Sequence, residues 1–256
     1  MKVTVCQWDS RPEALESQLH ALAEHCRRNA SELLLLPEMP FDDWLAGSPE
    51  VDPARWEVSV ERHLRAIERI SKVLKLSLLG SRPVVDVWGV RRNRAFLWGV
   101  QEGLVDGHDK IHLPEEEGYW EARWYQAGSP RLKPFVLEGC LAASLLCSEL
   151  WFFEHARRYG EQKAHLICLS RATSSIDTDN WIAAGKTAAV VAGAYCLSSN
   201  QSRPGGVLPD MAGSGWIIDP DGEVLALTSD AEPFVTLEVD LGYAEAAKAT
   251  YPRYLK

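Results

Sequence analysis

The chain has 256 residues, of which 46% are hydrophobic and 25% are charged, a composition typical of a soluble globular protein with a sizeable core. Its formal net charge of −9 argues against binding to nucleic acid or to an anionic membrane surface, because both require basic patches. No apolar stretch approaches the roughly 20 residues needed to span a bilayer, and we expect one domain over residues 1–256.

Strand patterns and helix patterns alternate along the chain. In the first half, strands are predicted at 2–8, 33–36, 78–81 and 94–101, and helices at 12–29 and 56–76. Residues 102–131 are predicted to form a long functional loop. In the second half, strands are predicted at 135–137, 141–146, 164–169, 194–199, 216–219, 224–227 and 234–239, and helices at 153–160 and 181–191. Such alternation, with a strand-rich end, predicts a layered α/β fold.

The cysteines and the N-terminus bear on the cellular compartment. The six cysteines include no CxxC pair, and several lie in apolar strands, which predicts reduced core thiols. The chain opens directly on a predicted strand, so we expect no secretory signal and a cytoplasmic protein. The histidines are scattered rather than clustered with thiols, which argues against a zinc site.

Glu38 is the first candidate catalytic residue. The four leucines at 33–36 predict a buried strand that Pro37 ends, so Glu38 follows at its carboxyl edge, where open α/β sheets bind ligands. A carboxylate among apolar neighbours is desolvated, and its pKa rises toward the range that a general base needs. The alternative is a glutamate in a surface loop.

Lys110 is the second candidate. It lies between a turn that contains Gly103 and Gly107 and the proline at position 114. A lone lysine is usually a solvated surface charge, so the pattern around it carries more information than the residue itself.

Cys147 is the third and most informative candidate. It ends the apolar run 141–146 and precedes a short predicted helix that Gly160 closes. A strand–turn–helix junction lifts a side chain out of the sheet toward the first amides of a helix, which is expected to lower the thiol pKa and to make a nucleophile. The alternative is a small core residue.

Taken together, the segments Leu-Leu-Pro-Glu38, His-Asp-Lys110-Ile-His-Leu-Pro and Leu-Leu-Cys147-Ser-Glu-Leu-Trp resemble the three signature segments of the nitrilase (carbon–nitrogen hydrolase) superfamily. They occur in the family's order and at its usual separations. The resemblance extends from the strand at 3–8 to the strand–turn–strand at 213–224, and so covers nearly the whole chain.

The resemblance implies a Glu–Lys–Cys triad at Glu38, Lys110 and Cys147. It also implies a second glutamate near the lysine. The local pattern at 121–128 assigns that role to Glu121, whereas counting forward from the lysine selects Glu117. No metal and no cofactor are implied.

The implied fold is a four-layer α-β-β-α sandwich. Members of the family usually pair through helices into an eight-layer homodimer, and some assemble into higher homo-oligomers. Here the helix after Cys147 and the helix at Trp181 are expected to supply the interface. The implied reaction is hydrolysis of a small-molecule amide through a Cys thioester, with the backbone N–H of Ser148 and Lys110 stabilising the oxyanion. Nitrile or N-carbamoyl hydrolysis remains an alternative.

Other residues near the motifs are candidates for substrate contact. Aromatic side chains near the motif segments predict an aromatic-lined pocket or ordinary core packing. These side chains are Trp44, Tyr119, Trp120, Trp124, Trp151 and Trp181, of which Trp120 and Trp151 are the chosen substrate-binding candidates. Arg171 follows a strand and is expected to meet a substrate carboxylate or to form a salt bridge. The Gly/Pro-rich segment 200–206 is expected to form a cleft wall or an inert surface loop.

Two further classes of function stay open on the sequence. One is a catalytically silent binding relative. The other is a Cys–His hydrolase that pairs Cys147 with His155 or His165, although His155 lies on the predicted helix next to the nucleophile, which is a poor geometry for a base.

Overall fold

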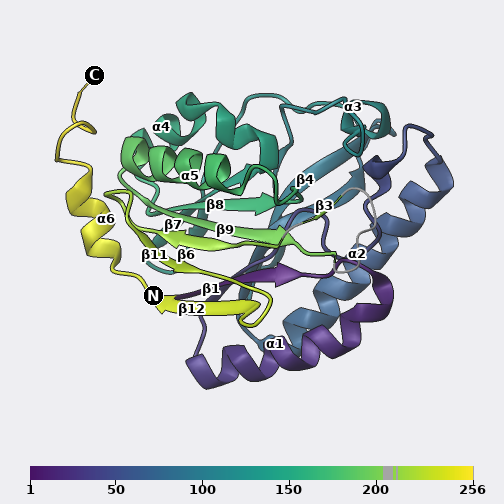
Figure 1. Ribbon diagram of the computed structural model, residues 1–256, viewed down its shortest axis with the longest axis horizontal. Helices are drawn as coiled ribbons and strands as arrows, with labels where there is room; N and C mark the ends of the chain where they lie inside the picture. The colour runs from purple at the N-terminus through teal and green to yellow at the C-terminus, as the bar shows by residue number, and fades with distance from the viewer. Residues whose placement is uncertain (204–209, 212, 256) are drawn as a thin grey trace.

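The structure, a computed structural model, describes residues 1–203, 210–211 and 213–255. In this part of the chain, twelve strands form one mixed β-sheet, with the order β5-β4-β3-β2-β1-β9-β8-β7-β6; β12 pairs with β1, and β10 pairs with β9 and β11 (Figure 1). The strands are β1 (Lys2–Trp8), β2 (Leu33–Leu35), β3 (Ser77–Val85), β4 (Arg91–Gly99), β5 (Gly103–Asp109), β6 (Phe135–Leu137), β7 (Cys140–Leu146), β8 (Leu166–Arg171), β9 (Tyr195–Gln201), β10 (Trp216–Ile218), β11 (Val224–Leu227) and β12 (Phe234–Glu238).

Helices cover both outer faces of the folded sheet. They are α1 (Leu15–Asn29), α2 (Pro53–Leu74), α3 (Glu121–Trp124), α4 (Phe153–Glu161), α5 (Thr178–Ala192) and α6 (Leu241–Ala247), with short 3-10 turns η1 (Pro12–Ala14), η2 (Leu45–Gly47) and η3 (Cys147–Trp151). Helices α1 and α2 pack on the half of the sheet that contains β1 to β5, and α4 and α5 pack on the other half (Figure 1). The fold is the predicted α-β-β-α sandwich.

Strand β1 joins the two halves of the sheet. It pairs with β2 along one edge; along the other edge it pairs first with β12 and then, near its end, with β9. The central core lies between the halves, where Leu33 and Leu35 meet side chains of β7, β8 and β9. Leu34 and Leu36 point the other way, toward α1 and α2. Because both faces of β2 are covered, its sequence is apolar at every position rather than alternating.

The region predicted as one long loop, 102–131, contains regular structure, and that prediction is wrong. Strand β5 forms an antiparallel hairpin with β4, and α3 follows it. Strand β5 lies at the edge of the sheet and carries polar residues with two glycines, so it shows no hydrophobic alternation. Pairing with β4 and the ion pair of Arg94 with Asp109, whose Nε and Oδ1 atoms lie 2.6 Å apart, hold it in place.

Other predicted elements shift only at their ends. Helix α2 begins at Pro53, where the Asp52 side chain accepts hydrogen bonds from the backbone N–H groups of Ala54 and Arg55, and it ends before Lys75, whose φ is 52°. Helix α6 was not predicted. Of the Gly/Pro-rich segment 200–206, residues 204–206 lie outside the described residues. Among the helices that the structure describes, none is both long and apolar enough to cross a membrane.

Candidate active site

The three motif segments meet at one edge of the folded sheet. Glu38 lies three residues beyond the end of β2, Lys110 directly follows β5, and Cys147 directly follows β7. The backbone N–H of Glu38 donates to the carbonyl oxygen of Arg171 at 3.2 Å, and the hydroxyl of Ser170 donates to the carbonyl oxygen of Leu36 at 2.8 Å. These bonds tie the end of β2 to the end of β8 and so fix the two halves of the sheet at the site.

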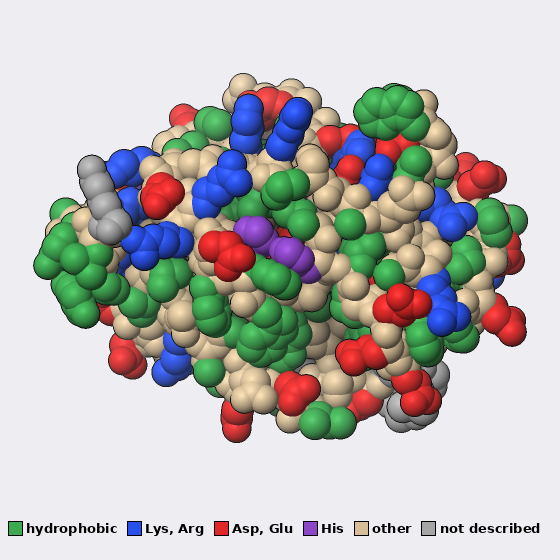
Figure 2. Space-filling model, turned by 90° about the horizontal axis from the view of Figure 1, so that it is seen from above, with side chains coloured by type: hydrophobic (Ala, Val, Ile, Leu, Met, Phe, Trp, Pro, Cys, Tyr) green, Lys and Arg blue, Asp and Glu red, His purple; other side chains and the backbone are tan. Residues whose placement is uncertain are grey.

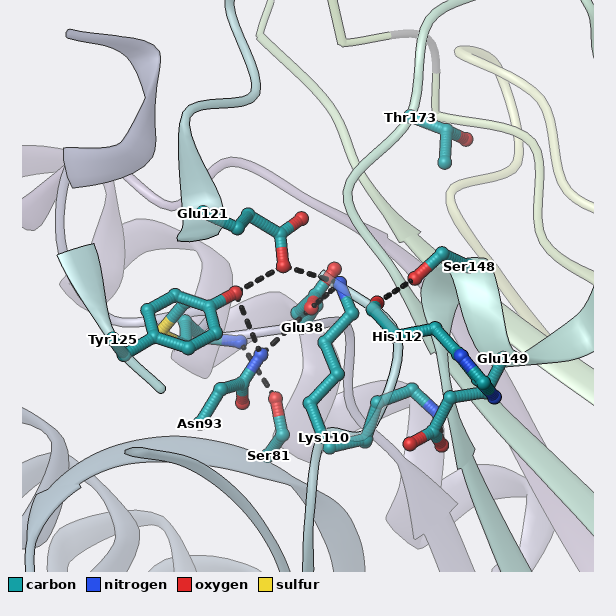
Figure 3. A network of polar contacts seen from close by, with 12 residues as sticks. Glu38, Ser81, Asn93, Lys110, His112, Glu121, Tyr125, Ser148, Glu149 and Thr173 are labelled. Atoms are coloured by element: carbon teal, nitrogen blue, oxygen red, sulfur yellow. Dashed lines mark hydrogen bonds and ion pairs between the residues drawn. The ribbon is translucent and has the colours of Figure 1, made fainter. Parts of the chain in front are cut away.

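A buried ion-pair cluster forms the centre of the site (Figure 3). The ammonium of Lys110 donates to Oε1 of Glu38 at 2.7 Å and to Oε2 of Glu121 at 2.6 Å. Glu38 and Lys110 are fully buried, and Glu121 is 1% exposed. An unpaired buried charge is strongly destabilising, so each carboxylate depends on the lysine. The structure thus places Glu121 against Lys110, whereas Glu117 is exposed.

Two residues that sequence reasoning missed complete the cluster. The side-chain amide of Asn93 donates to Oε1 of Glu38 at 2.7 Å, and the hydroxyl of Tyr125 donates to Oε2 of Glu121 (Figure 3). Asn93 lies in the basic run 91–94, but it faces inward from β4 and is fully buried. Asn93, Ala95 and Leu97 are alternate residues of β4 and are all buried. This two-residue spacing with two apolar residues is the sequence feature that could have indicated an inward-facing Asn93.

Cys147 occupies a strained turn. Its φ is 47°, a left-handed conformation that residues with a side chain seldom adopt, and strain of this kind concentrates at functional sites. Glu149 holds the turn: one carboxylate oxygen accepts from the backbone N–H of Leu146 and the other from that of Ile111, both at 2.8 Å. This one carboxylate therefore ties the cysteine turn to the lysine segment.

The protonation states follow from burial. Desolvation raises the pKa of Glu38 to about 7, although Lys110 and the neighbouring thiol of Cys147 act in the opposite direction. Desolvation and then the charge of Glu38 raise the pKa of the Cys147 thiol. The prediction that the helix N-terminus lowers this pKa is therefore wrong. The five-residue η3 turn does not offset complete burial next to a carboxylate, so the resting thiol keeps its proton.

Cys147 opens into a cavity of about 270 Å³, at the small end of the range for small-molecule sites. Among the described residues it is lined by Pro114, Glu116, Tyr119, Glu121, Cys147, Ser148, Trp151, Ala172, Thr173, Ser174, Asp177 and Trp181. Of the predicted substrate contacts, Ser148 and Trp151 line the cavity. The hydroxyl of Ser148 donates to the carbonyl oxygen of His112 at 2.5 Å.

The other two predicted substrate contacts lie off the cavity wall. The Arg123 guanidinium covers the ring of Trp120, 4.5 Å from its centroid. Arg171 is 1% exposed and lies 4.1 Å above the centroid of the Trp216 ring. Its guanidinium donates to Ser198 and Thr173, each at 2.8 Å, and to the carbonyl oxygen of Ser214. Arg171 therefore braces strands behind the site and forms no salt bridge within the described residues.

Histidines are not neighbours of the sulfur. His155 pairs with His112, their Nε2 atoms 2.9 Å apart, and His165 binds the backbone of Leu141 and the carboxylate of Glu245. Over the part of the chain that the structure describes, neither His155 nor His165 contacts Cys147. This arrangement gives no support to a Cys–His hydrolase.

Comparison with known proteins gives matches to one enzyme family. The model of the carbon-nitrogen hydrolase family matches residues 2–249. The chain is 24% identical over 266 aligned positions to a chloroplastic omega-amidase of Arabidopsis thaliana, covering 98% of this chain and 70% of that protein. It is 26% identical over 154 positions to a 2-oxoglutaramate amidase of Bacillus subtilis, covering 58% of this chain and about half (51%) of that protein.

Solved structures share the fold. A carbon-nitrogen hydrolase from Helicobacter pylori superposes with a TM-score of 0.87 at 18% identity, over 99% of this chain and 94% of that one. Nit3 of Saccharomyces cerevisiae, a member of the nitrilase superfamily, gives 0.81 at 18% identity, over 98% and 94%. An amidase from Nesterenkonia, with acrylamide added to its active-site cysteine, gives 0.78 at 18% identity, over 96% and 95%.

Proposed function

The chain belongs to the carbon–nitrogen hydrolase family and is a C–N hydrolase, and we propose that it is an amidase that cleaves a small non-peptide amide to a carboxylic acid and ammonia or an amine. The observation that carries the proposal is the buried Lys110 held between Glu38 and Glu121, close to the thiol of Cys147, which lines the cavity. The amidase names of the two relatives favour an amide over a nitrile.

In the first step, Glu38 acts as the general base. Its Oε2 is buried and accepts no hydrogen bond from a nitrogen or hydroxyl in the described part of the chain, so it is free to take a proton. Because the resting thiol is neutral, the proton passes to Glu38 as the sulfur attacks the carbonyl carbon. A carboxyl with a pKa of about 7 is suited to this exchange at neutral pH.

Lys110 stabilises the oxyanion that this attack creates. An ammonium has three N–H donors, and two of them bind Glu38 and Glu121, which leaves one for the oxyanion beside the backbone N–H of Ser148. A preorganised donor of this kind contributes about 3–4 kcal/mol to lowering the barrier. The two carboxylates hold the ammonium in position and raise the pKa of Lys110, so that it stays charged.

In the second step, the tetrahedral intermediate collapses. Glu38 returns its proton to the departing nitrogen, the C–N bond breaks, and an acyl-thioester remains on Cys147. Water then attacks the thioester carbon and passes a proton to Glu38. The C–S bond breaks, Glu38 returns that proton to the sulfur of Cys147, and the acid leaves. Oε1 of Glu121 is buried without a hydrogen-bond partner among the described residues, on a side chain that lines the cavity, and we assign to it an N–H of the bound amide.

The pH dependence of turnover tests the role of Glu38. Because the base must be deprotonated, kcat/KM is expected to rise with pH and to reach half its limit near pH 7, the pKa of Glu38. The measurement is ammonia release from a small amide between about pH 5 and pH 9. Glu38→Gln should lower kcat/KM by at least about 10³-fold and remove the rising limb of the pH profile. The control variant Glu117→Gln, at an exposed position, should keep the native kcat/KM and the native pH profile. A flat profile in the native protein would contradict the proposal.

We also propose that the protein forms a homodimer through η3, α4 and α5. Large apolar side chains stay exposed on η3 and α4: Trp151 is 43% exposed and Phe153 is 36% exposed. On the face seen from above, Figure 2 shows hydrophobic side chains gathered around a pair of neighbouring histidines. Contiguous exposed apolar surface of this kind favours association, and analytical ultracentrifugation measures it directly.

A further inference from the structure

We infer that the substrate is an amide whose acyl part carries a positively charged amino group, and not a carboxylate. This inference rests on the proposed amidase function and concerns the same cavity. Three properties of the cavity carry it: the sign of the charges in its wall, the aromatic side chains beside the sulfur, and a buried carboxylate oxygen that has no partner within the described residues.

The charged side chains in the cavity wall are all acidic. Glu116, Glu121 and Asp177 line it, and the lining that the structure describes contains no lysine, arginine or histidine. Asp210 adds a further negative charge close by, since it and Glu116 both help to raise the pKa of Tyr119, after desolvation as the main cause. The cavity wall therefore attracts a positively charged group of the substrate and repels a substrate carboxylate.

Lys110 and Arg171 already bind other groups of the protein. Lys110 binds Glu38 and Glu121, and its remaining N–H points to the oxyanion in the proposed reaction. Arg171 lies outside the cavity lining and is almost fully buried; its guanidinium donates to Ser198, Thr173 and the backbone of Ser214. A substrate carboxylate would therefore enter the cavity without a cationic partner, and burying an unpaired carboxylate is unfavourable.

Aromatic rings form one side of the cavity. Trp151 and Trp181 both line it, with ring centroids 4.7 Å apart and an interplanar angle of 52°, and Tyr119 lines it as well. The faces of tryptophan and tyrosine rings attract ammonium groups through their quadrupoles. The same rings also cover the apolar chain that links an amino group to the amide.

A buried carboxylate oxygen gives a separate indication that the cavity binds a ligand. Oε1 of Glu121 is buried and has no hydrogen-bond partner in the described residues, on a side chain that is 1% exposed. A buried carboxylate oxygen can only accept a hydrogen bond, and leaving it unmet is costly. The ligand of this cavity is therefore expected to bring a hydrogen-bond donor to this oxygen, which an amide N–H or an ammonium supplies and a carboxylate does not.

Three amides of matched length test the inference: valeramide, its terminal amino derivative and the monoamide of glutaric acid. These differ only in a neutral, positive or negative end group. We expect kcat/KM for the amino derivative to exceed that for the glutaric monoamide by at least about tenfold. The ratio of the two kcat/KM values should decrease as salt is added, because salt screens charge interactions. A preference for the glutaric monoamide would overturn the inference and leave the amidase function in place.

Charge-matched double variants locate the effect. The first double variant, Glu116→Gln/Asp177→Asn, removes two carboxylates from the cavity wall. The second, Glu117→Gln/Asp179→Asn, removes two exposed carboxylates that lie close by in sequence but do not line the cavity. Because Glu116 and Asp177 are also exposed to solvent, the first variant should reduce the preference for the amino derivative by about three- to tenfold. The second should change it less than twofold. Equal effects in both variants would overturn the inference.

A binding experiment separates this inference from the amidase proposal. If none of the three amides is hydrolysed, the amidase proposal fails for substrates of this size. Calorimetric titration of the Cys147→Ala protein with the same three compounds then decides the question of charge. Tighter binding of the amino derivative supports the inference, and equal or tighter binding of the glutaric monoamide overturns it.

Discussion

Replacing Cys147 with alanine is expected to reduce kcat by at least about 10⁴-fold, because the replacement removes the only nucleophile in the proposed reaction. Steady-state ammonia release measures the loss. The fold should persist, since alanine fits the space of the thiol and the left-handed backbone of Cys147 is strained for either residue. Far-UV circular dichroism and the unfolding midpoint check this.

A second cysteine variant serves as the control for that experiment. Cys168 is also fully buried, but it lies in the core between the two halves of the sheet. Cys168→Ala should cost about 1 kcal/mol of stability through the small cavity it leaves and should keep native turnover. Comparable loss of activity in the two variants would mean that the thiol at position 147 has no special role.

Replacing Lys110 with methionine is expected to have the largest effect on stability of any change at the site. It leaves Glu38 and Glu121 buried together without a cation, and breaking a buried ion pair in this way costs about 3–5 kcal/mol. Turnover should fall by at least about 10²-fold because the oxyanion loses a donor. Urea unfolding measures the first effect. Lys72→Met, on an exposed side chain of α2, is the matched control and should cost less than about 1 kcal/mol.

The pH dependence of this loss follows from the sign of the pKa shift. Without the lysine, burial and the repulsion of Glu121 hold the folded-state pKa of the Glu38 carboxyl above its unfolded value. A carboxyl with a raised pKa loses its proton more easily when unfolded, so folding stability falls as pH rises. The Lys110→Met protein should therefore be closer to native stability at about pH 5 than at about pH 8.

A double variant separates stability from chemistry. Lys110→Met/Glu121→Gln removes one of the two stranded carboxylates and should recover part of the lost stability, while turnover stays low because the oxyanion donor is still missing. Recovery of turnover along with stability would contradict the role given to Lys110.

The sequence predicted the fold and the positions of the central residues because these depend on strong local signals. The leucines before Glu38 form a strand that is buried on both faces, and the run before Cys147 ends in a sharp turn. Each motif residue therefore lies at the end of a strand, where the sheet itself brings them together.

What the sequence did not predict depends on contacts between distant segments. Strand β5 has no hydrophobic alternation and exists because β4 pairs with it. Asn93 lies in a basic run of the sequence, and only the pairing of β4 in the sheet directs its side chain toward Glu38. The direction of the thiol pKa depends on how completely Cys147 is buried and on its distance from a carboxylate, and neither can be obtained from the residues around it.

The four predicted substrate contacts show the same difference between local sequence and distant contacts. Trp151 and Ser148 follow Cys147 directly and line the cavity with it. Arg171 and Trp120 are also close to motif segments in sequence, but Trp216 and Arg123 cover them. Packing against side chains from other elements, rather than nearness in sequence, decides which residues face the substrate.

The central claim is that the amide carbon becomes covalently attached to the sulfur of Cys147 during turnover. The most direct test is mass spectrometry of protein quenched in acid while it hydrolyses a slow amide, followed by peptide mapping. We expect an acyl adduct on the peptide that contains Cys147 and on none of the other five cysteines, and we expect this adduct to decay at the rate of product release. Sustained turnover without an adduct on this residue, or with one elsewhere, would contradict it.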